Sequence, residues 1–280
     1  MSASIGVAVG PARMLGRERR GQLVQIAEAD VPAELERFAE AVSKSRAEIE
    51  AAKQELTQQH GPTYAPILDV YLLMHGDALL IDAVDTAIRD ERVNAEWAVE
   101  QVTARLKQPL LADSSSYFQE RANDIDHVKE HLLRHLCGGE QRERPVDGPS
   151  VLLARDLTPA DAVRLLRPPT VGLVTELGAG SSHTAILARA FGVPAVVGVG
   201  QIPEDIEDGE LVLVDGFSGN VTVRASEEAR LVAEERRRRF TAFLEAERSA
   251  AAVTRDGVSI SVSANVELPN EIEVALDNGA

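Results

Sequence analysis

The sequence lacks several features that define common classes of protein. Cys137 is the one cysteine among 280 residues, which excludes an intrachain disulfide and suits a reducing cytoplasm. Aromatic residues make up only 4% of the chain, so its cores are expected to pack mainly from aliphatic side chains. The chain also has no apolar run as long as a membrane span and no recognisable signal peptide. These absences predict a cytoplasmic protein without a membrane partner.

Basic residues are scarce as well. Lysine and arginine total 29 against 45 aspartates and glutamates, which leaves a formal net charge of −16. An acidic surplus argues against nucleic acid as a partner and favours basic partners. The hydrophobic content of 44% is ample for packed cores, and the length allows two domains.

The most informative stretch has the pattern of strand, loop, helix and strand. Residues 171–174 form an apolar run rich in β-branched side chains, which is typical of a buried strand. A glycine-rich loop with two serines follows, and serines are suited to cap the helix predicted over residues 184–191. A glycine and a proline end that helix, and residues 194–199 form a second strand candidate. His183 therefore lies at the first turn of the helix.

A histidine in this position is suited to carry a phosphoryl group. The unpaired N–H groups and dipole of a helix N-terminus attract an anion and disfavour imidazolium, so the ring keeps a nucleophilic lone pair. Glycines allow the backbone to approach a phosphate closely, and hydroxyl groups can donate hydrogen bonds to it. The candidate phosphate-supporting residues are Gly178, Gly180, Ser181, Ser182 and Thr184. Taken alone, these residues also fit a plain turn with an exposed histidine at a cap.

The segment Gly178-Ala-Gly-Ser-Ser-His183-Thr-Ala-Ile-Leu-Ala-Arg189 resembles the phosphohistidine signature of the phosphoenolpyruvate-utilising enzymes. That family includes Enzyme I of the bacterial phosphotransferase system, pyruvate phosphate dikinase and phosphoenolpyruvate synthase. The resemblance implies that His183 is phosphorylated and adds Arg189 to the phosphate-supporting residues. Ala179 and Gly180 depart from the family pattern, which has a second glycine and, in Enzyme I, usually a basic residue. Family members also often have a threonine near the phosphohistidine, at the position of Ala162.

Residues 31–143 have the periodicity of a helical bundle. Apolar side chains between residues 30 and 60 follow a heptad-like stripe, and four shorter amphipathic segments follow. Residues 1–30 and 144–225 have β character, with strand candidates at residues 5–10 and 23–26. We therefore predict an α/β phosphohistidine (swivelling) domain into which an all-α helical bundle subdomain is inserted.

The bundle resembles the subdomain of Enzyme I that docks the phosphocarrier protein HPr, through residues 69–77 and 117–124. Tyrosine at position 71 resembles the nitrogen-related branch of the family, whereas the sugar branch commonly has histidine there. The expected partner is thus HPr or its nitrogen-branch relative. The candidate carrier-binding residues are Tyr71, Met74, Asp77, Leu80, Leu110, Tyr117 and Arg121. For each apolar residue among them, a place in the helical core is an equally good interpretation.

Three histidines, His127, His131 and His135, follow one another at four-residue spacing on one helical face. Two histidines so spaced can chelate zinc, but no cysteine or carboxylate at ligand spacing completes a motif. We interpret them as a solvated face and expect no metal site. His60 and His75 belong to no recognisable motif.

Residues 226–255 are predicted to form a charged linker helix, and residues 256–280 to begin a TIM barrel. Residues 263–267 resemble the first strand of the phosphoenolpyruvate-binding barrel of Enzyme I. The resemblance implies that phosphoenolpyruvate and Mg²⁺ bind in the rest of that barrel, which also makes the homodimer contact. This truncated chain is then expected only to exchange phosphoryl groups with the carrier. The alternatives are a domain of a pyruvate phosphate dikinase-like or phosphoenolpyruvate synthase-like enzyme, and a regulatory docking module without catalysis.

Overall fold

The structure is a computed structural model that describes residues 1–15, 21–112, 115–138, 148–249 and 252–261, together with residues 263, 264, 272, 275 and 276. The side chains of residues 116, 117, 120 and 247–249 lie outside the description, and so does that of the predicted carrier-binding residue Tyr117. The predicted start of a TIM barrel, residues 256–280, is only partly described. Within residues 252–261, the β pairing is an isolated bridge between Val253 and Ser259.

One seven-stranded sheet forms the centre of the molecule. Its strands are β1 (Ser2–Ser4), β2 (Val7–Met14), β3 (Ser150–Ala154), β4 (Thr170–Thr175), β5 (Ala195–Val196), β6 (Leu211–Asp215) and β7 (Asn220–Val223). The spatial order is β1-β5-β4-β3-β2-β6-β7. Strands β2 to β5 run parallel, whereas β1 and the β6–β7 hairpin pair antiparallel at the two edges.

Alternate side chains of the parallel strands enter two different cores, as the two-residue period of a strand requires. Leu152 and Leu173 pack with α6 (Pro159–Leu165) and α7 (His183–Ala190). Val151, Leu153 and Val174 belong to a second cluster with Val212 and Val214 of β6. Because β4 and β6 are not neighbours in the sheet, this shared cluster indicates that the sheet curls around its second core.

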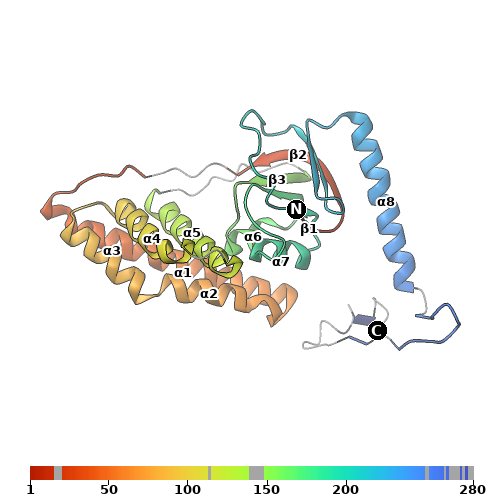
Figure 1. Cartoon of the computed structure of the whole chain (residues 1–280), viewed down its shortest axis with the longest axis horizontal. Coiled ribbons are helices and arrows are strands. Elements are labelled where there is room, and N and C mark those ends of the chain that lie inside the picture. Colours follow the sequence, from red (N-terminus) through yellow and green to blue (C-terminus); the bar gives the residue numbers. More distant parts are fainter. Residues whose placement is uncertain are drawn as a thin grey trace.

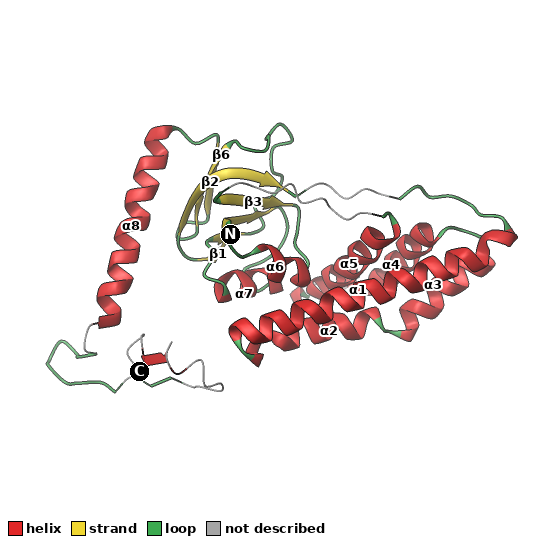
Figure 2. Ribbon diagram, turned by 180° about the vertical axis from the view of Figure 1, so that it is seen from behind, coloured by secondary structure: helices red, strands yellow, loops and turns green. Residues whose placement is uncertain are grey.

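Among the described residues, five α-helices lie between β2 and β3 in the sequence and form a bundle beside the sheet (Figure 1). They are α1 (Val31–His60), α2 (Ala65–His75), α3 (Ala78–Asp90), α4 (Ala95–Leu111) and α5 (Ser116–Leu136). The apolar stripe predicted for α1 is confirmed, since Phe38, Ile49 and Leu56 are each at most 1% exposed. Seen from behind, the bundle occupies one side of the sheet and α8 the other (Figure 2).

The N-terminal strand predictions are wrong in detail. Instead of ending at Gly10, β2 continues through Pro11 to Met14. Pro11 fits within this strand because it stands at the end of the β6 pairing, just before the β3 pairing begins at Ala12. The second candidate, residues 23–26, forms a single bridge between Gln25 and Val93.

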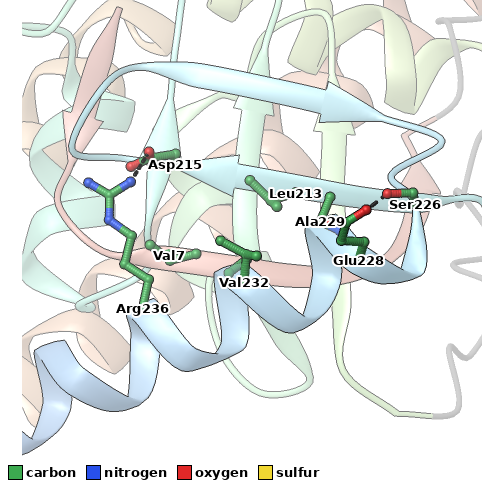
Figure 3. A pocket seen from close by; sticks show the side chains of 9 residues that line it. Val7, Leu213, Asp215, Ser226, Glu228, Ala229, Val232 and Arg236 are labelled. Carbon is green, nitrogen blue, oxygen red and sulfur yellow. Dashed lines mark hydrogen bonds and ion pairs between the residues drawn. The ribbon is translucent and has the colours of Figure 1, made fainter.

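Helix α8 (Glu227–Ser249) packs against β2, an inner strand of the sheet (Figure 3). Between them lies a groove of about 440 Å³, lined by apolar side chains that include Val7, Leu213 and Val232. An ion pair of 2.5 Å between Arg236 and Asp215 joins α8 to the end of β6. Among the described residues, no helix combines the length and the apolar character needed to cross a membrane.

Candidate active site

The loop between β4 and α7 places His183 at the start of α7, as the sequence predicts. Ser182 is the N-cap, and its Oγ accepts a hydrogen bond of 3.3 Å from the Ala185 N–H. Gly178 turns the loop with a φ of 105°, a conformation that favours glycine. The side chain of His183 is 29% exposed, so the ring is accessible from solvent.

One ring nitrogen of His183 faces side chains of the helical bundle. Its Nδ1 lies 3.2 Å from the hydroxyl of Tyr71 on α2 and 3.5 Å from Oδ1 of Asp124 on α5. The Tyr71 hydroxyl donates its one proton to Asp124 Oδ1 at 2.5 Å. The tyrosine oxygen can therefore only accept from His183, so Nδ1 carries the proton and Nε2 carries the lone pair.

A second histidine completes this arrangement. His127 Nδ1 lies 3.2 Å from the Tyr71 hydroxyl, and its Nε2 lies 2.9 Å from Asp156 Oδ2, in the loop after β3. Burial lowers the pKa of His127, but the hydrogen bond and charge of Asp156 outweigh it, so the pKa is raised. An imidazolium at His127 donates in both directions, which agrees with a Tyr71 oxygen that accepts from both histidines.

We call His183, Tyr71, Asp124, His127 and Asp156 the His183 layer. Burial raises the pKa of Asp124, but hydrogen bonds from His183 and Tyr71 outweigh this effect and lower it. Burial and the neighbouring Asp124 carboxylate raise the pKa of Tyr71, which keeps its hydroxyl protonated. The layer thus holds a charged carboxylate and a neutral phenol against His183 Nδ1.

No sequence motif marked Asp124, His127 or Asp156 as a site residue. Asp124 and His127 are three residues apart on α5, a spacing that places them on one helical face. The threonine that the family often has at position 162 is replaced by a buried alanine in α6. The Tyr71 hydroxyl provides a contact to the ring of His183 from a different part of the chain.

In addition to the Ser182 cap, two of the predicted phosphate-supporting side chains donate hydrogen bonds to backbone carbonyls. Thr184 is 3% exposed, and its Oγ1 donates to the Leu157 carbonyl at 2.9 Å. Arg189 donates to the carbonyls of Ala3 and Gly180 at 2.7 and 3.1 Å. These contacts fix the loop around His183. A direct role of Gly178, Gly180, Ser181, Ser182, Thr184 or Arg189 in binding phosphate stays a prediction.

The predicted carrier-binding residues do not form a single exposed surface. Tyr71 and Leu80 are 2% and 5% exposed, because Tyr71 is part of the His183 layer and Leu80 packs in the bundle core. For these two side chains, a surface for a partner is the wrong interpretation in this structure. Asp77 is exposed and caps α3 through the Leu79 N–H. Arg121 pairs with Asp124 at 3.0 Å.

Met74 and Leu110, the remaining described members of that set, are partly buried. Large exposed apolar side chains occur nearby in the sequence and were not predicted. Leu73 and Leu79, on either side of the α2–α3 turn, are 74% and 72% exposed. Leu111 at the end of α4 and Phe118 near the start of α5 are 52% and 37% exposed.

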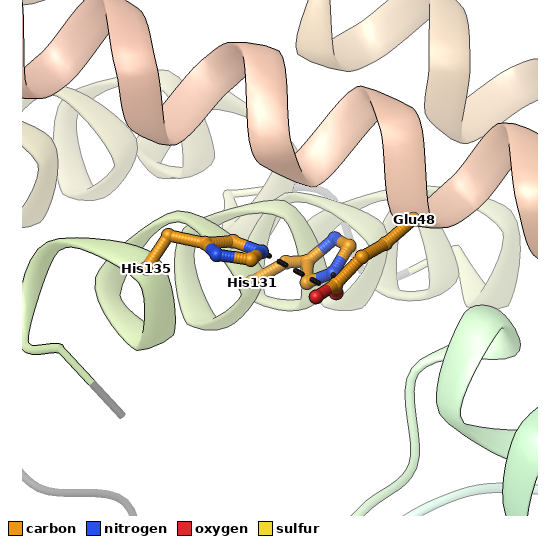
Figure 4. A group of neighbouring side chains, drawn as sticks. All are labelled: Glu48, His131 and His135. Atoms are coloured by element: carbon orange, nitrogen blue, oxygen red, sulfur yellow. Dashed lines mark hydrogen bonds and ion pairs between the residues drawn. The ribbon is translucent and has the colours of Figure 1, made fainter. Parts of the chain in front are cut away.

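The solvated histidine face predicted for α5 is wrong. His127 and His131 are only 8% and 2% exposed, because α5 packs against α1 and α2. Glu48 of α1 supplies the carboxylate that the local sequence lacks (Figure 4). His75, which the sequence places in no motif, is 1% exposed and lies against the ring of His131.

The fold and the site together define a class of protein: a curled sheet that presents a histidine at a helix N-terminus, with one ring nitrogen held by side chains of a helical bundle. Residues 1–121 match the family described as PEP-utilising enzyme, N-terminal, and residues 146–219 match PEP-utilising enzyme, mobile domain. The second match contains His183. The chain therefore belongs to the family of phosphoenolpyruvate-utilising enzymes, which confirms the resemblance seen in the sequence.

The chain is similar to phosphoenolpyruvate-protein phosphotransferases and to solved structures of Enzyme I. The phosphoenolpyruvate-protein phosphotransferases of Bacillus sp. (strain S) and Geobacillus stearothermophilus are each 35% identical to this chain over 295 residues. The alignments cover 100% of this chain and 49% of each relative, so the chain spans about half their length. A solution structure of Enzyme I matches with 31% identity and a TM-score of 0.66, over 85% of this chain and 97% of that one. The N-terminal domain of a nitrogen-type Enzyme I matches with 25% identity and a TM-score of 0.56, over 86% and 98%.

Proposed function

We propose that this chain is the phosphohistidine-bearing part of a phosphoenolpyruvate-protein phosphotransferase. In this proposal His183 receives a phosphoryl group that originates from phosphoenolpyruvate and passes it to a histidine of an HPr-type carrier protein. The observation that carries the proposal is the contact of His183 Nδ1 with Tyr71 and Asp124. It leaves Nε2, for which no hydrogen bond is found among the described residues, as the attacking atom.

The chemistry is a simple exchange of bonds at phosphorus. A bond forms between His183 Nε2 and phosphorus while the bond from phosphorus to the donor breaks, either the enol oxygen of phosphoenolpyruvate or the carrier nitrogen. The leaving group retains the electron pair of the broken bond. Positive charge develops on the imidazole as Nε2 bonds to phosphorus, and Asp124 and Tyr71 stabilise the Nδ1–H. Backbone N–H groups at the start of α7 are suited to the phosphate oxygens.

The Mg²⁺ that the family implies for the whole enzyme does not fit the side chains described here. Mg²⁺ prefers six oxygen ligands, of which several are waters. Within the described residues, the group of acidic and histidine side chains close enough to hold an ion is Glu48, His131 and His135, and two of its three donors are imidazoles. No step of the mechanism at His183 is therefore assigned to the ion.

The finer organisation of the chain follows the same proposal. The sheet with α6 and α7 would be a swivelling domain, the five-helix bundle an inserted carrier-binding subdomain, and α8 a linker to a phosphoenolpyruvate-binding barrel. Dimerisation through that barrel and a cytoplasmic location belong to this proposal as well. A dikinase-like or synthase-like enzyme and a non-catalytic docking module are the alternatives.

Phosphoryl exchange tests the proposal directly. The chain is mixed with an HPr-type carrier that has been phosphorylated with labelled phosphate, and the product is digested and mapped. We expect one acid-labile, base-stable label in the peptide that contains His183. A docking module without catalysis would bind the carrier and acquire no label, and label on another residue would contradict the assignment of His183.

Carrier docking provides a second test, based on the exposed leucines of the bundle. An apolar side chain that is exposed in the free protein can supply affinity, while the acidic surface speeds encounter with a basic carrier. We expect Leu79→Asp to weaken carrier binding by about 10-fold or more and to leave folding intact, because Leu79 is 72% exposed. Leu231→Asp is the matched control, since Leu231 is 54% exposed on α8. Calorimetric titration that gives equal affinities for the two variants would place the dock elsewhere.

A further inference from the structure

We propose that Glu48, His131 and His135 form a binding site for a divalent transition-metal ion of the zinc type. Glu48 Oε2 of α1 lies 2.8 Å from His131 Nε2 and 3.3 Å from His135 Nε2, both on α5. The three candidate ligand atoms all lie within 4.8 Å of one another. Figure 4 shows the carboxylate reaching from one helix to the two imidazoles of the other.

The geometry suits such an ion. Histidines four residues apart lie on one face of a helix and can bind one ion through two ring nitrogens. With bonds of roughly 2.0–2.1 Å, neighbouring ligands of tetrahedral zinc are about 3.3 Å apart. Two of the ligand contacts here, 2.8 and 3.3 Å, are already close to that value. Side-chain rotations can close the remaining distance.

A second, independent observation comes from His75 on α2. Its Nδ1 lies 2.8 Å from the Tyr71 carbonyl, to which it donates, so Nε2 carries the lone pair. This Nε2 is buried and has no hydrogen-bond partner among the described residues. His135 Nε2 is also buried, and its 3.3 Å contact with Glu48 does not have the geometry of a hydrogen bond. The His75 ring packs against His131 with centroids 5.3 Å apart. His135 Nε2 belongs to the candidate ligand set, and an ion that accepts its lone pair would satisfy this buried nitrogen.

The ion also has a route into the site. The Glu48 side chain is 51% exposed, whereas those of His131 and His135 are 2% and 12% exposed. A carboxylate at the surface can therefore capture an ion and deliver it to the imidazoles behind it. The donor set of nitrogens with one oxygen favours zinc, cobalt or nickel over Mg²⁺.

The site lies close to the proposed phosphoryl chemistry and is distinct from it. His131 follows His127, and His75 follows Tyr71, by four residues on the same helices, so the cluster is one helical turn from the His183 layer. An ion bound to Glu48, His131 and His135 joins α1 to α5. It is expected to stabilise the bundle that holds Tyr71 and Asp124 against His183.

The test is zinc binding to the untagged chain, measured by competition with a chromogenic chelator. We expect one Zn²⁺ per chain with a Kd below about 10 µM, a visible absorption spectrum of tetrahedral type with Co²⁺, and no competition from Mg²⁺. Zn²⁺ should also raise the melting temperature by about 5 °C when its concentration is 100 times the Kd.

Two variants at partly exposed ligands keep the test independent of folding. Glu48→Gln and His135→Ala are each expected to weaken zinc binding by about 10-fold or more, while His60→Ala, at a histidine outside the cluster, leaves it unchanged. Circular dichroism establishes that each variant is folded. Absence of binding at this affinity, or binding that both ligand variants retain, would overturn the proposal.

Discussion

The Asp124→Asn variant is expected to transfer phosphoryl groups through His183 about 100-fold or more slowly, and His183→Ala is expected to transfer none. Asp124 uses both carboxylate oxygens, since Oδ1 accepts from Tyr71 and Oδ2 accepts from Arg121. Asparagine has only one acceptor oxygen, and the charged guanidinium is the stronger donor for it. The amide NH₂ group would then face Tyr71, whose hydroxyl would turn and donate to His183 Nδ1. That change moves the proton of His183 to Nε2 and removes the nucleophilic lone pair.

A matched control for this variant lies on the same helix. Asp126 is two residues away, pairs with Lys107 and Lys129, and makes no contact with the His183 layer among the described interactions. Asp126→Asn is therefore expected to retain nearly the rate of the unchanged chain. Rapid-quench measurement of label transfer from the phosphorylated carrier gives the rates, and ¹⁵N chemical shifts of the His183 ring report the tautomer. A rate for Asp124→Asn within about threefold of the unchanged chain would show that the carboxylate does not control the nucleophile.

The second large effect is expected in stability, from the buried ion pair between α5 and α6. Arg134 donates to both carboxylate oxygens of Asp161 at 2.9 and 2.5 Å, and Thr158 Oγ1 donates to Oδ2 at 2.7 Å. Asp161 is 7% exposed, so loss of Arg134 leaves a buried carboxylate with too few partners. We expect Arg134→Met to lower the free energy of unfolding by about 3 kcal/mol. The value lies at the low end of the range for such pairs because Arg164 still reaches Oδ1 at 3.1 Å.

An exposed ion pair between α1 and the segment that follows α6 provides the control. Arg167 pairs with Glu55 of α1, and its side chain is 48% exposed. Arg167→Met is expected to cost less than about 1 kcal/mol, since solvent screens exposed pairs. Urea denaturation followed by circular dichroism measures both variants. Equal and small losses of unfolding free energy in the two variants would mean that burial does not strengthen the Arg134–Asp161 pair.

The same pair predicts how stability depends on pH. Burial raises the pKa of the Asp161 carboxyl, but the charge and hydrogen bonds of Arg134 outweigh burial and hold the pKa at about 2. The pKa in the folded state is thus lower than in the unfolded chain, so the contribution to stability is present above about pH 4 and is lost as the pH falls toward 2. Denaturation at a series of pH values should show this loss in the unchanged chain and a smaller one in Arg134→Met.

The elements that depend on local interactions follow from the sequence alone. The loop before His183, its serine cap and its glycine at a positive φ are encoded within about a dozen residues, because caps and turns are satisfied by neighbours in the chain. The stripe of α1 is local in the same sense, and it is found where the pattern predicts it. The motif around His183 could therefore be identified from the sequence alone.

The contacts between distant side chains depend on the tertiary fold. Tyr71 and Asp124 reach His183 across 112 and 59 positions of sequence, and no local period marks such a contact. Leu79 and Leu80 have the same side chain at adjacent positions, yet one is 72% and the other 5% exposed, since only packing against other helices selects the buried face. His131 and His135 were taken for a solvated face because their carboxylate partner, Glu48, lies on α1. Burial and partner choice depend on how the helices pack. This packing places His127 in the His183 layer and brings His131 and His135 next to Glu48.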